Sequence, residues 1–273
     1  MAQRSKAYFL AKFITNYIVQ HQDMTDLADS ALFYSDDVGY DIYGAVWINP
    51  PFALTSLNFN GFAMKKMPNY EGQDPSTADF THNNLDSYVF PSSFISMISV
   101  DFTDNPLTSL TFGTALGSLT DLTLIQTLFT SLTIPANLVS LLNLLISDTL
   151  INTLIINSAC TALVSIDGTS SPISSASIPA SCVNLTTLIF LNCNLSDFTS
   201  QAAWTLIASV NLSGNSLTAL GIEHVLVGLA SSGTAVTVNV AGGTNASHTT
   251  WTAAALSAET TIGVNGGSVI FNP

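Results

Sequence analysis

The sequence predicts an α+β solenoid, a coil of short parallel strands that carries helices in its last turns. Three observations predict this fold. A unit of the form L-x-x-L-x-L recurs from residue 107 to about residue 240. Most copies begin alternately 10 and 12 residues apart, so two units make one coil of about 22 residues. Towards the C-terminus, the apolar spacing changes to that of a helix.

Residues 1–37 are expected to form a helical attachment and oligomerisation hairpin. The first helix opens at Arg4-Ser5-Lys6, and a polar turn separates it from a second helix over residues 26–33. The apolar stripe of the first helix is too wide to be buried on one side, so it needs several neighbours. Self-association, with a trimer favoured, would provide them; the alternative is an amphipathic hairpin that packs on the first coil. The residues expected to make these contacts are Leu10, Phe13, Ile14, Tyr17, Leu27, Leu32 and Phe33.

Residues 38–106 are rich in aromatic residues and proline, and alternation in segments such as residues 40–47 and 54–59 suggests strands. We expect an irregular β cap for the solenoid or a small β domain. Within this region, residues 64–80 are expected to form a long exposed loop.

Residues 107–243 carry the repeat itself. In a strand of the form L-x-L, the two leucines point to one side and the residue between them points outward, so the leucines of successive coils stack into one core. Each unit closes with a small or polar residue, where the chain turns inward and backbone groups need partners. The closing residues are therefore expected to be structural and not ligands: Asn137, Thr149, Cys193 and Asn215.

The copies that end in Cys193 and Asn215 match the longer form L-x-x-L-x-L-x-x-N/C-x-L through Leu195 and Leu217. This pattern resembles the leucine-rich-repeat family. The resemblance covers residues 107–243 and implies a right-handed coil with short parallel strands.

A helical period predicts short helices over residues 199–207 and 219–229, with Gly228 or Gly233 as the stop of the second. Residues 244–273 have weak periodicity and an aromatic anchor at Trp251. We expect them to form a C-terminal cap, because an open-ended solenoid must shield its last core layer.

Composition excludes several classes of protein. A chain of 273 residues that is 47% hydrophobic and 8% charged can bury a large core, which argues against intrinsic disorder. The formal net charge of −13, with every Lys and Arg before residue 67, argues against nucleic-acid binding. The outward positions of the repeats carry Ser, Thr and Asn, which offer hydrogen bonds to a polar partner such as a glycan or a protein coat.

The three cysteines, Cys160, Cys182 and Cys193, cannot complete a disulfide framework and are expected to be buried thiols. Lys12 interrupts the apolar run near the N-terminus, so no secretion signal is predicted. No stretch has the length and apolarity needed to cross a bilayer, so no membrane insertion is expected.

The sequence indicates no enzyme. The four histidines are far apart in sequence, and we expect no metal or cofactor. Asp101 and Asp104 lie close enough to suggest calcium, but a solvated turn is the better interpretation because the glycine and terminal glutamate of an EF-hand loop are missing. Paired carboxylates, which a glycan-degrading enzyme needs, are not evident among the scattered acids of the repeats.

Two N-terminal segments, Phe13-Ile14-Thr15-Asn16 and Asp26-Leu27-Ala28-Asp29-Ser30-Ala31-Leu32-Phe33, resemble the N-terminal element of bacteriophage fibre and adhesin-type virion proteins. The resemblance covers about 35 residues and implies attachment to a virion or to sister subunits. It points to a virion spike or fibre-type adhesin, assembled in the host cytoplasm, that binds other virion proteins and a host glycan or surface protein. The alternatives are an architectural capsid or collar component, a glycan-degrading virion enzyme and a cellular leucine-rich-repeat protein.

Overall fold

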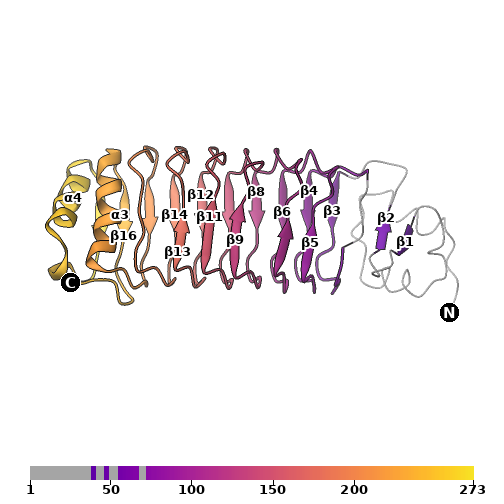
Figure 1. Ribbon diagram of the computed structural model, residues 1–273, viewed down its shortest axis with the longest axis horizontal. Helices are drawn as coiled ribbons and strands as arrows, with labels where there is room; N and C mark the ends of the chain where they lie inside the picture. Colours follow the sequence, from indigo (N-terminus) through magenta and orange to yellow (C-terminus); the bar gives the residue numbers. More distant parts are fainter. Residues whose placement is uncertain (1–37, 41–45, 49–54, 68–71) are drawn as a thin grey trace. The chain divides into compact units, whose positions relative to one another are not determined.

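The computed structural model describes residues 38–40, 46–48, 55–67 and 72–273 (Figure 1). The chain divides into two compact units, Met1–Leu119 and Thr120–Pro273, which are described one at a time. The predicted hairpin at residues 1–37 lies outside the described residues, as do its seven predicted contact residues.

The first unit holds two rows of parallel strands. One row joins β3 (Ser56–Asn58), β4 (Thr77–Asp79) and β6 (Ser99–Asp101), and the other joins β5 (Ser87–Val89) to β7 (Ser109–Thr111). A separate antiparallel pair is formed by β1 (Val38–Tyr40) and β2 (Val46–Ile48). Parallel coils therefore begin at Ser56, inside the region for which the sequence predicts an irregular cap or small domain.

Phenylalanine fills the core of these early coils where leucine fills it later. Phe59, Phe80 and Phe102 follow their strands and are at most 4% exposed, and the rings of Phe80 and Phe102 lie 5.3 Å apart. A search for leucine spacing misses these coils because aromatic rings occupy the inward positions. Tyr88 of β5 also lies among these rings, 5.3 Å from Phe80.

The second unit continues the same design with leucine, isoleucine and valine inside. Its main row is β8 (Asp121–Thr123), β10 (Asn143–Leu145), β12 (Ser165–Asp167), β14 (Thr187–Ile189), β15 (Ser209–Asn211), β16 (Thr237–Asn239) and β17 (Ser268–Ile270), all parallel. A second row joins β9 (Ser131–Ile134), β11 (Thr153–Ile156) and β13 (Ser175–Ser177). Paired residues such as Asp121 and Asn143 are 22 residues apart, which confirms two short units per coil.

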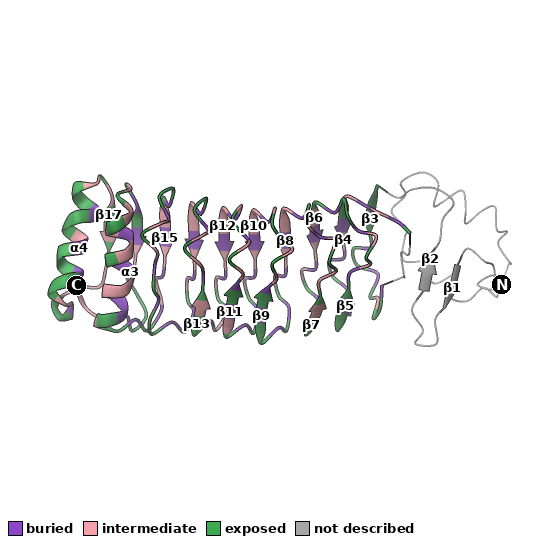
Figure 2. Ribbon diagram, turned by 45° about the horizontal axis from the view of Figure 1, so that its top comes forward, coloured by how far each residue is buried: buried purple, intermediate pink, exposed green. Residues whose placement is uncertain are grey.

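The middle residue of each main-row strand from β8 to β16 is buried, and the residues on either side of it are more exposed (Figure 2). Leu122, Leu144, Ile166 and Leu188 form one column and are at most 1% exposed. Each layer is close-packed on the next, so a side chain in the column is enclosed by equivalent side chains one coil away.

Helix α3 (Ala219–Ser232) confirms the helix predicted over residues 219–229. Thr218 caps its N-terminus by accepting a hydrogen bond from the Gly221 N–H, and Gly233 ends it with φ 74°. Gly228 lies inside the helix and does not stop it.

The helix predicted over residues 199–207 is wrong, because this segment forms turns. Trp204 and Ile207 are at most 1% exposed and take the inward positions held by Cys182 and Leu185 one coil earlier. Their spacing of three residues fits a helix and also fits this turn-rich side of the coil. The following coil, from β15 to β16, is longer and has room for α3.

The C-terminal residues form a short 3-10 helix η2 (His248–Thr250), helix α4 (Ala253–Val264) and strand β17. Helix α4 packs on α3, and its Ala255, Ala258 and Ile262 are buried. Trp251, the predicted anchor, is 6% exposed, and its ring lies 5.3 Å from Phe271. In the part of the chain that the structure describes, no helix is both long and apolar enough to cross a bilayer.

Candidate functional site

One buried polar residue follows each of β4, β6, β8, β10, β12, β14, β15 and β16, and we call these residues the turn ladder. In the first unit it contains Asn83 and Asn105, and in the second unit it contains Thr127, Thr149, Ser171, Cys193, Asn215 and Asn245. All of these side chains are at most 5% exposed. Such deeply buried polar groups must be satisfied by hydrogen bonds within the protein.

Asn215 shows how the ladder satisfies the backbone. Its Nδ2 donates to the carbonyl oxygens of Phe190 at 2.7 Å and Leu212 at 2.9 Å, and its Oδ1 accepts from the Leu195 N–H at 3.0 Å. The side chain thus joins its own coil to the preceding coil at the point where the chain leaves the strand. Asn105 makes the same contacts in the first unit, with Phe80, Phe102 and Leu85.

The middle of the ladder uses smaller donors. The hydroxyls of Thr149 and Ser171 lie 2.9 Å apart, and Ser171 Oγ donates to the Ile146 oxygen at 2.8 Å. Cys193 Sγ donates to the Gly168 oxygen at 3.3 Å. Asn137, the fourth closing residue chosen from the sequence, lies elsewhere, half-buried in the turn after β9.

The residue before each ladder position except Asn245 has a left-handed backbone. The φ values are 54–59° at six non-glycine residues and 72° at Gly214. Asn and Asp tolerate this conformation better than other non-glycine residues. The residues with positive φ in this column are His82, Asp104, Gln126, Asp148, Ser170, Asn192 and Gly214.

The outer strand face of the second unit consists of the first and third residues of the main-row strands. Registered pairing brings equivalent side chains to neighbouring strands, about 4.8 Å apart. The first positions are Asp121, Asn143, Ser165, Thr187, Ser209, Thr237 and Ser268, and the third are Thr123, Leu145, Asp167, Ile189, Asn211, Asn239 and Ile270. The face is mostly polar and contains no Lys or Arg.

Several of the acids have structural partners. Asp167 Oδ1 accepts from the Thr169 N–H at 2.9 Å and from its hydroxyl at 2.7 Å. Asp101, which the sequence raised as a calcium ligand, makes the same two contacts with Thr103. Among residues 55–67 and 72–273, no group of three or more His, Cys, Asp or Glu side chains is placed to hold a metal ion.

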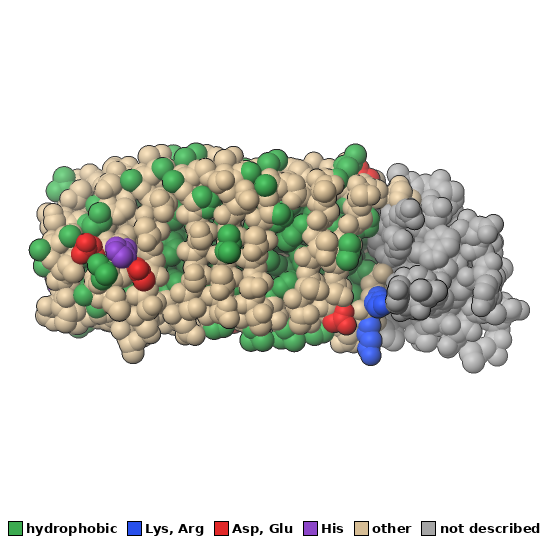
Figure 3. Space-filling model, viewed as in Figure 1, with side chains coloured by type: hydrophobic (Ala, Val, Ile, Leu, Met, Phe, Trp, Pro, Cys, Tyr) green, Lys and Arg blue, Asp and Glu red, His purple; other side chains and the backbone are tan. Residues whose placement is uncertain are grey.

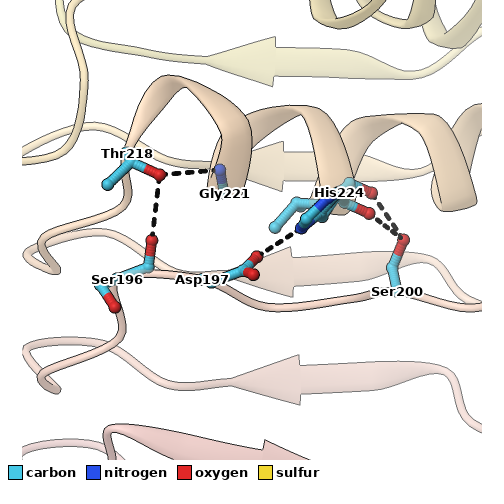
Figure 4. Close-up of polar contacts among 7 residues, drawn as sticks. Ser196, Asp197, Ser200, Thr218, Gly221 and His224 are labelled. Atoms are coloured by element: carbon cyan, nitrogen blue, oxygen red, sulfur yellow. Dashed lines mark hydrogen bonds and ion pairs between the residues drawn. The ribbon is translucent and has the colours of Figure 1, made fainter.

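The sequence missed a histidine–carboxylate pair between α3 and the preceding coil (Figure 4). His224 Nδ1 lies 2.7 Å from Asp197 Oδ1, and both side chains are partly exposed. Ser200 is close by, but its hydroxyl donates to the backbone oxygen of Val225 at 2.6 Å and not to the imidazole ring. The three side chains therefore lack the alignment of a serine nucleophile with its base.

A second such pair lies in the C-terminal elements. His248 Nε2 lies 2.8 Å from Glu259 Oε2, and the His248 ring stacks on Phe271 at 4.1 Å. His224 and Asp197 are 27 residues apart in sequence, whereas His248 and Glu259 are 11 residues apart. The first pair links α3 to the preceding coil, and the second links the 3-10 helix η2 to α4.

No protein-family model and no curated protein matches the sequence. Among solved structures, a chain of the Toll–Spatzle complex from Drosophila matches with a TM-score of 0.51 and 15% identity, over 73% of this chain and 31% of that chain. Human 5T4, also named Wnt-activated inhibitory factor 1 or trophoblast glycoprotein, has a TM-score of 0.34 and 15% identity, over 70% of this chain and 66% of that chain.

The Toll-complex chain, which matches with a TM-score above 0.5, has a leucine-rich-repeat fold. The likeness concerns the fold, and the chain spans about a third of the length of the Toll-complex chain that it matches. The leucine-rich-repeat-like solenoid expected from the sequence is thus present, with parallel strands in each unit and helices near the C-terminus.

Proposed function

We propose that this chain is a non-enzymatic adhesion module whose outer strand face binds a polar macromolecular surface, with a host glycan as the first candidate. The observation that carries the proposal is the chemistry of that face. Hydroxyl and amide groups recur on it in register, and its charged residues are Asp121 and Asp167. The view towards α3 likewise shows few charged side chains among the described residues (Figure 3). Such groups hydrogen-bond neutral sugars, and the aliphatic Leu145 and Ile189 among them can pack against the C–H faces of sugar rings.

The charge of the second unit supports a neutral ligand. No Lys or Arg follows residue 66, and the acids of the unit leave it with a negative charge. A phosphate-bearing or other polyanionic partner would be repelled. A glycan or a neutral protein surface fits better.

The finer part of the proposal places the module on a bacteriophage spike or fibre. Support for this setting comes from the sequence of residues 1–37 alone, through its resemblance to the N-terminal element of virion proteins. In that setting the hairpin would attach the chain to other virion proteins and hold three copies together. A purely architectural virion role would use the same fold with its outer strand face covered by neighbouring subunits.

Glycan-array binding of the full chain tests adhesion. Ser209 lies on the outer strand face, in β15 beside the central strand β14, and Ser209→Arg should lower affinity at least about 10-fold, equivalent to about 1.4 kcal/mol. The matched control is Ser175→Arg on the second row, also in a short strand, which should leave binding unchanged. Equal losses in both variants, or no glycan bound by the parent chain, would contradict the proposed surface.

Light scattering of the full chain and of residues 38–273 tests the attachment hairpin. We expect a trimer that becomes a monomer on truncation, because the wide apolar stripe of residues 1–37 would lose its neighbours. A monomer in both cases would assign the hairpin to a cap of the solenoid and remove the support for a virion setting.

A further inference from the structure

We propose that Cys160 and Cys182 form a disulfide between neighbouring coils when the protein meets a disulfide oxidant such as glutathione disulfide. Both residues are free thiols in the structure. The inference is independent of what the outer strand face binds.

The two cysteines occupy the same position in successive coils. Each follows an identical turn, in which the Cys160 N–H donates to the Asn157 oxygen at 3.0 Å and the Cys182 N–H donates to the Pro179 oxygen at 3.1 Å. Both side chains are fully buried. Cys182 Sγ donates to the Cys160 backbone oxygen at 3.5 Å, so the second thiol lies directly against the first residue.

Hydrogen bonds on both sides of the pair keep the two coils in register. Ser181 Oγ donates to the Ser158 oxygen at 2.7 Å, and Asn184 Nδ2 donates to the Thr161 oxygen at 2.9 Å. Neighbouring coils joined in this way are about 4.8 Å apart. That separation falls within the range of about 4.4–6.8 Å between Cα atoms that a disulfide requires.

Cys193 provides an internal control because it has no cysteine in a neighbouring coil. It belongs to the turn ladder, where Ser171 and Asn215 occupy the equivalent positions one coil before and one coil after. Its thiol donates to the Gly168 oxygen at 3.3 Å.

The reaction is a pair of thiol–disulfide exchanges. One cysteine thiolate attacks a sulfur of glutathione disulfide and releases one glutathione thiolate, leaving a mixed disulfide on the protein. The second cysteine thiolate attacks the protein sulfur of that bond and releases the other glutathione. The protein loses two electrons and two protons, and the oxidant is reduced to two molecules of glutathione.

Burial makes the exchange slow in the folded protein at neutral pH. It raises the pKa of the Cys160 thiol, and it raises that of the Cys182 thiol to about 11 with a further contribution from Cys160. Little thiolate is therefore available to attack. We expect the bond to form mainly while the chain folds, before the coils close over the thiols.

The bond would stabilise the solenoid. It closes a loop of one coil and so reduces the conformational freedom of the unfolded chain. The column on either side consists of Leu138 and Trp204, both fully buried, so the bridge would lie in the core.

Refolding the full chain from denaturant in a buffer of reduced and oxidised glutathione tests the proposal. Counting free thiols after unfolding should give one, against three for protein kept reduced. Peptide mapping with pepsin, which does not depend on Lys or Arg, should locate the bridge between Cys160 and Cys182. The oxidised protein should melt at a higher temperature than the reduced one, and a reductant should abolish the difference.

Three substitutions complete the test. Cys193→Ser should keep the bridge and leave no free thiol, whereas Cys160→Ser and Cys182→Ser should each leave two free thiols. If either of these last variants does not fold, the thiol count and melting temperature of Cys193→Ser decide. Three free thiols in the refolded parent chain, or a bridge that includes Cys193, would overturn the proposal.

Discussion

At the scale of single residues, the turn ladder supplies hydrogen-bond partners to backbone groups that are buried where the chain leaves a strand. An unpaired buried N–H or C=O group destabilises the folded state by about 1–3 kcal/mol. One amide side chain that pairs with three such groups therefore contributes strongly to stability. Asparagine does this at Asn215, while Thr149, Ser171 and Cys193 make fewer bonds in the middle of the second unit.

Asn215→Ala should lower the free energy of unfolding by about 3 kcal/mol. The substitution leaves the Leu195 N–H and the carbonyls of Phe190 and Leu212 without their partner in a buried site. Urea denaturation measures the change. Asn194→Ala, at an exposed turn position nearby, should change stability by less than about 0.5 kcal/mol. Comparable losses for both would show that the ladder contacts contribute little.

Cys193 should make stability depend on alkaline pH. Burial raises the pKa of its thiol from 9.0 to about 11, so above pH 9 the unfolded chain loses this proton while the folded chain keeps it. The unfolded state then binds fewer protons, and the free energy of unfolding falls as pH rises from about 9 to about 11.

The measurement is urea unfolding of the parent chain and of Cys193→Ser at several pH values. The parent should lose stability relative to the variant across this range, by about 1.4 kcal/mol for each unit of pKa shift. Parallel curves for the two proteins would rule out this titration. The thiols of Cys160 and Cys182 are present in both proteins and cancel in the comparison.

At the scale of elements, α3 lies so close to the preceding coil that two of its glycines face backbone. A Cβ on Gly221 would lie 2.5 Å from the Ser196 oxygen, and one on Gly228 would lie 2.5 Å from the Ser200 oxygen. The two positions are seven residues apart, on one side of the helix. Glycine in this helix therefore reflects packing, which explains why Gly228 does not end it.

The glycines of the two helices should respond to alanine with opposite signs. Gly228→Ala should destabilise the protein by about 2 kcal/mol, because the backbone of Ser200 cannot move away without displacing the coil. Gly263→Ala in α4 has open space around the new Cβ and should stabilise by about 0.5–1 kcal/mol. Thermal unfolding of both variants gives the signs, and destabilisation by both would show that α4 is also tightly packed.

At the scale of the whole molecule, acidic residues far outnumber basic residues. The formal net charge is −13, and the five basic residues all precede residue 67. Carboxylates of the second unit therefore repel one another with no Lys or Arg of that unit to offset them.

Salt should consequently stabilise this protein. Raising the ionic strength from about 0.01 M to 1 M shortens the screening length from about 30 Å to about 3 Å and weakens that repulsion. The melting temperature should rise, and Asp148→Asn, which removes one charge at a turn that asparagine also tolerates, should show a smaller rise. A melting temperature that falls with salt would indicate that specific ion pairs outweigh the general repulsion.

The sequence by itself determined the repeat, its two units per coil and the helix that follows residue 218. These features depend on apolar spacing along the chain, which is local information. It also indicated buried polar closing residues, because Thr149, Cys193 and Asn215 recur after the same apolar pattern.

Only the tertiary structure decided which residues share a column and what each one touches. The coils before residue 107 have phenylalanine at their inward positions, so the leucine spacing did not indicate them. The spacing of Trp204 and Ile207 fitted both a helix and a coil turn. Asn137 resembles the ladder residues in sequence but lies in another turn. His224 meets Asp197, and Cys160 meets Cys182, because stacking brings residues one coil apart into contact. Spacing along a chain reports which way a side chain faces, whereas its partners belong to the neighbouring coils, which only the folded structure supplies.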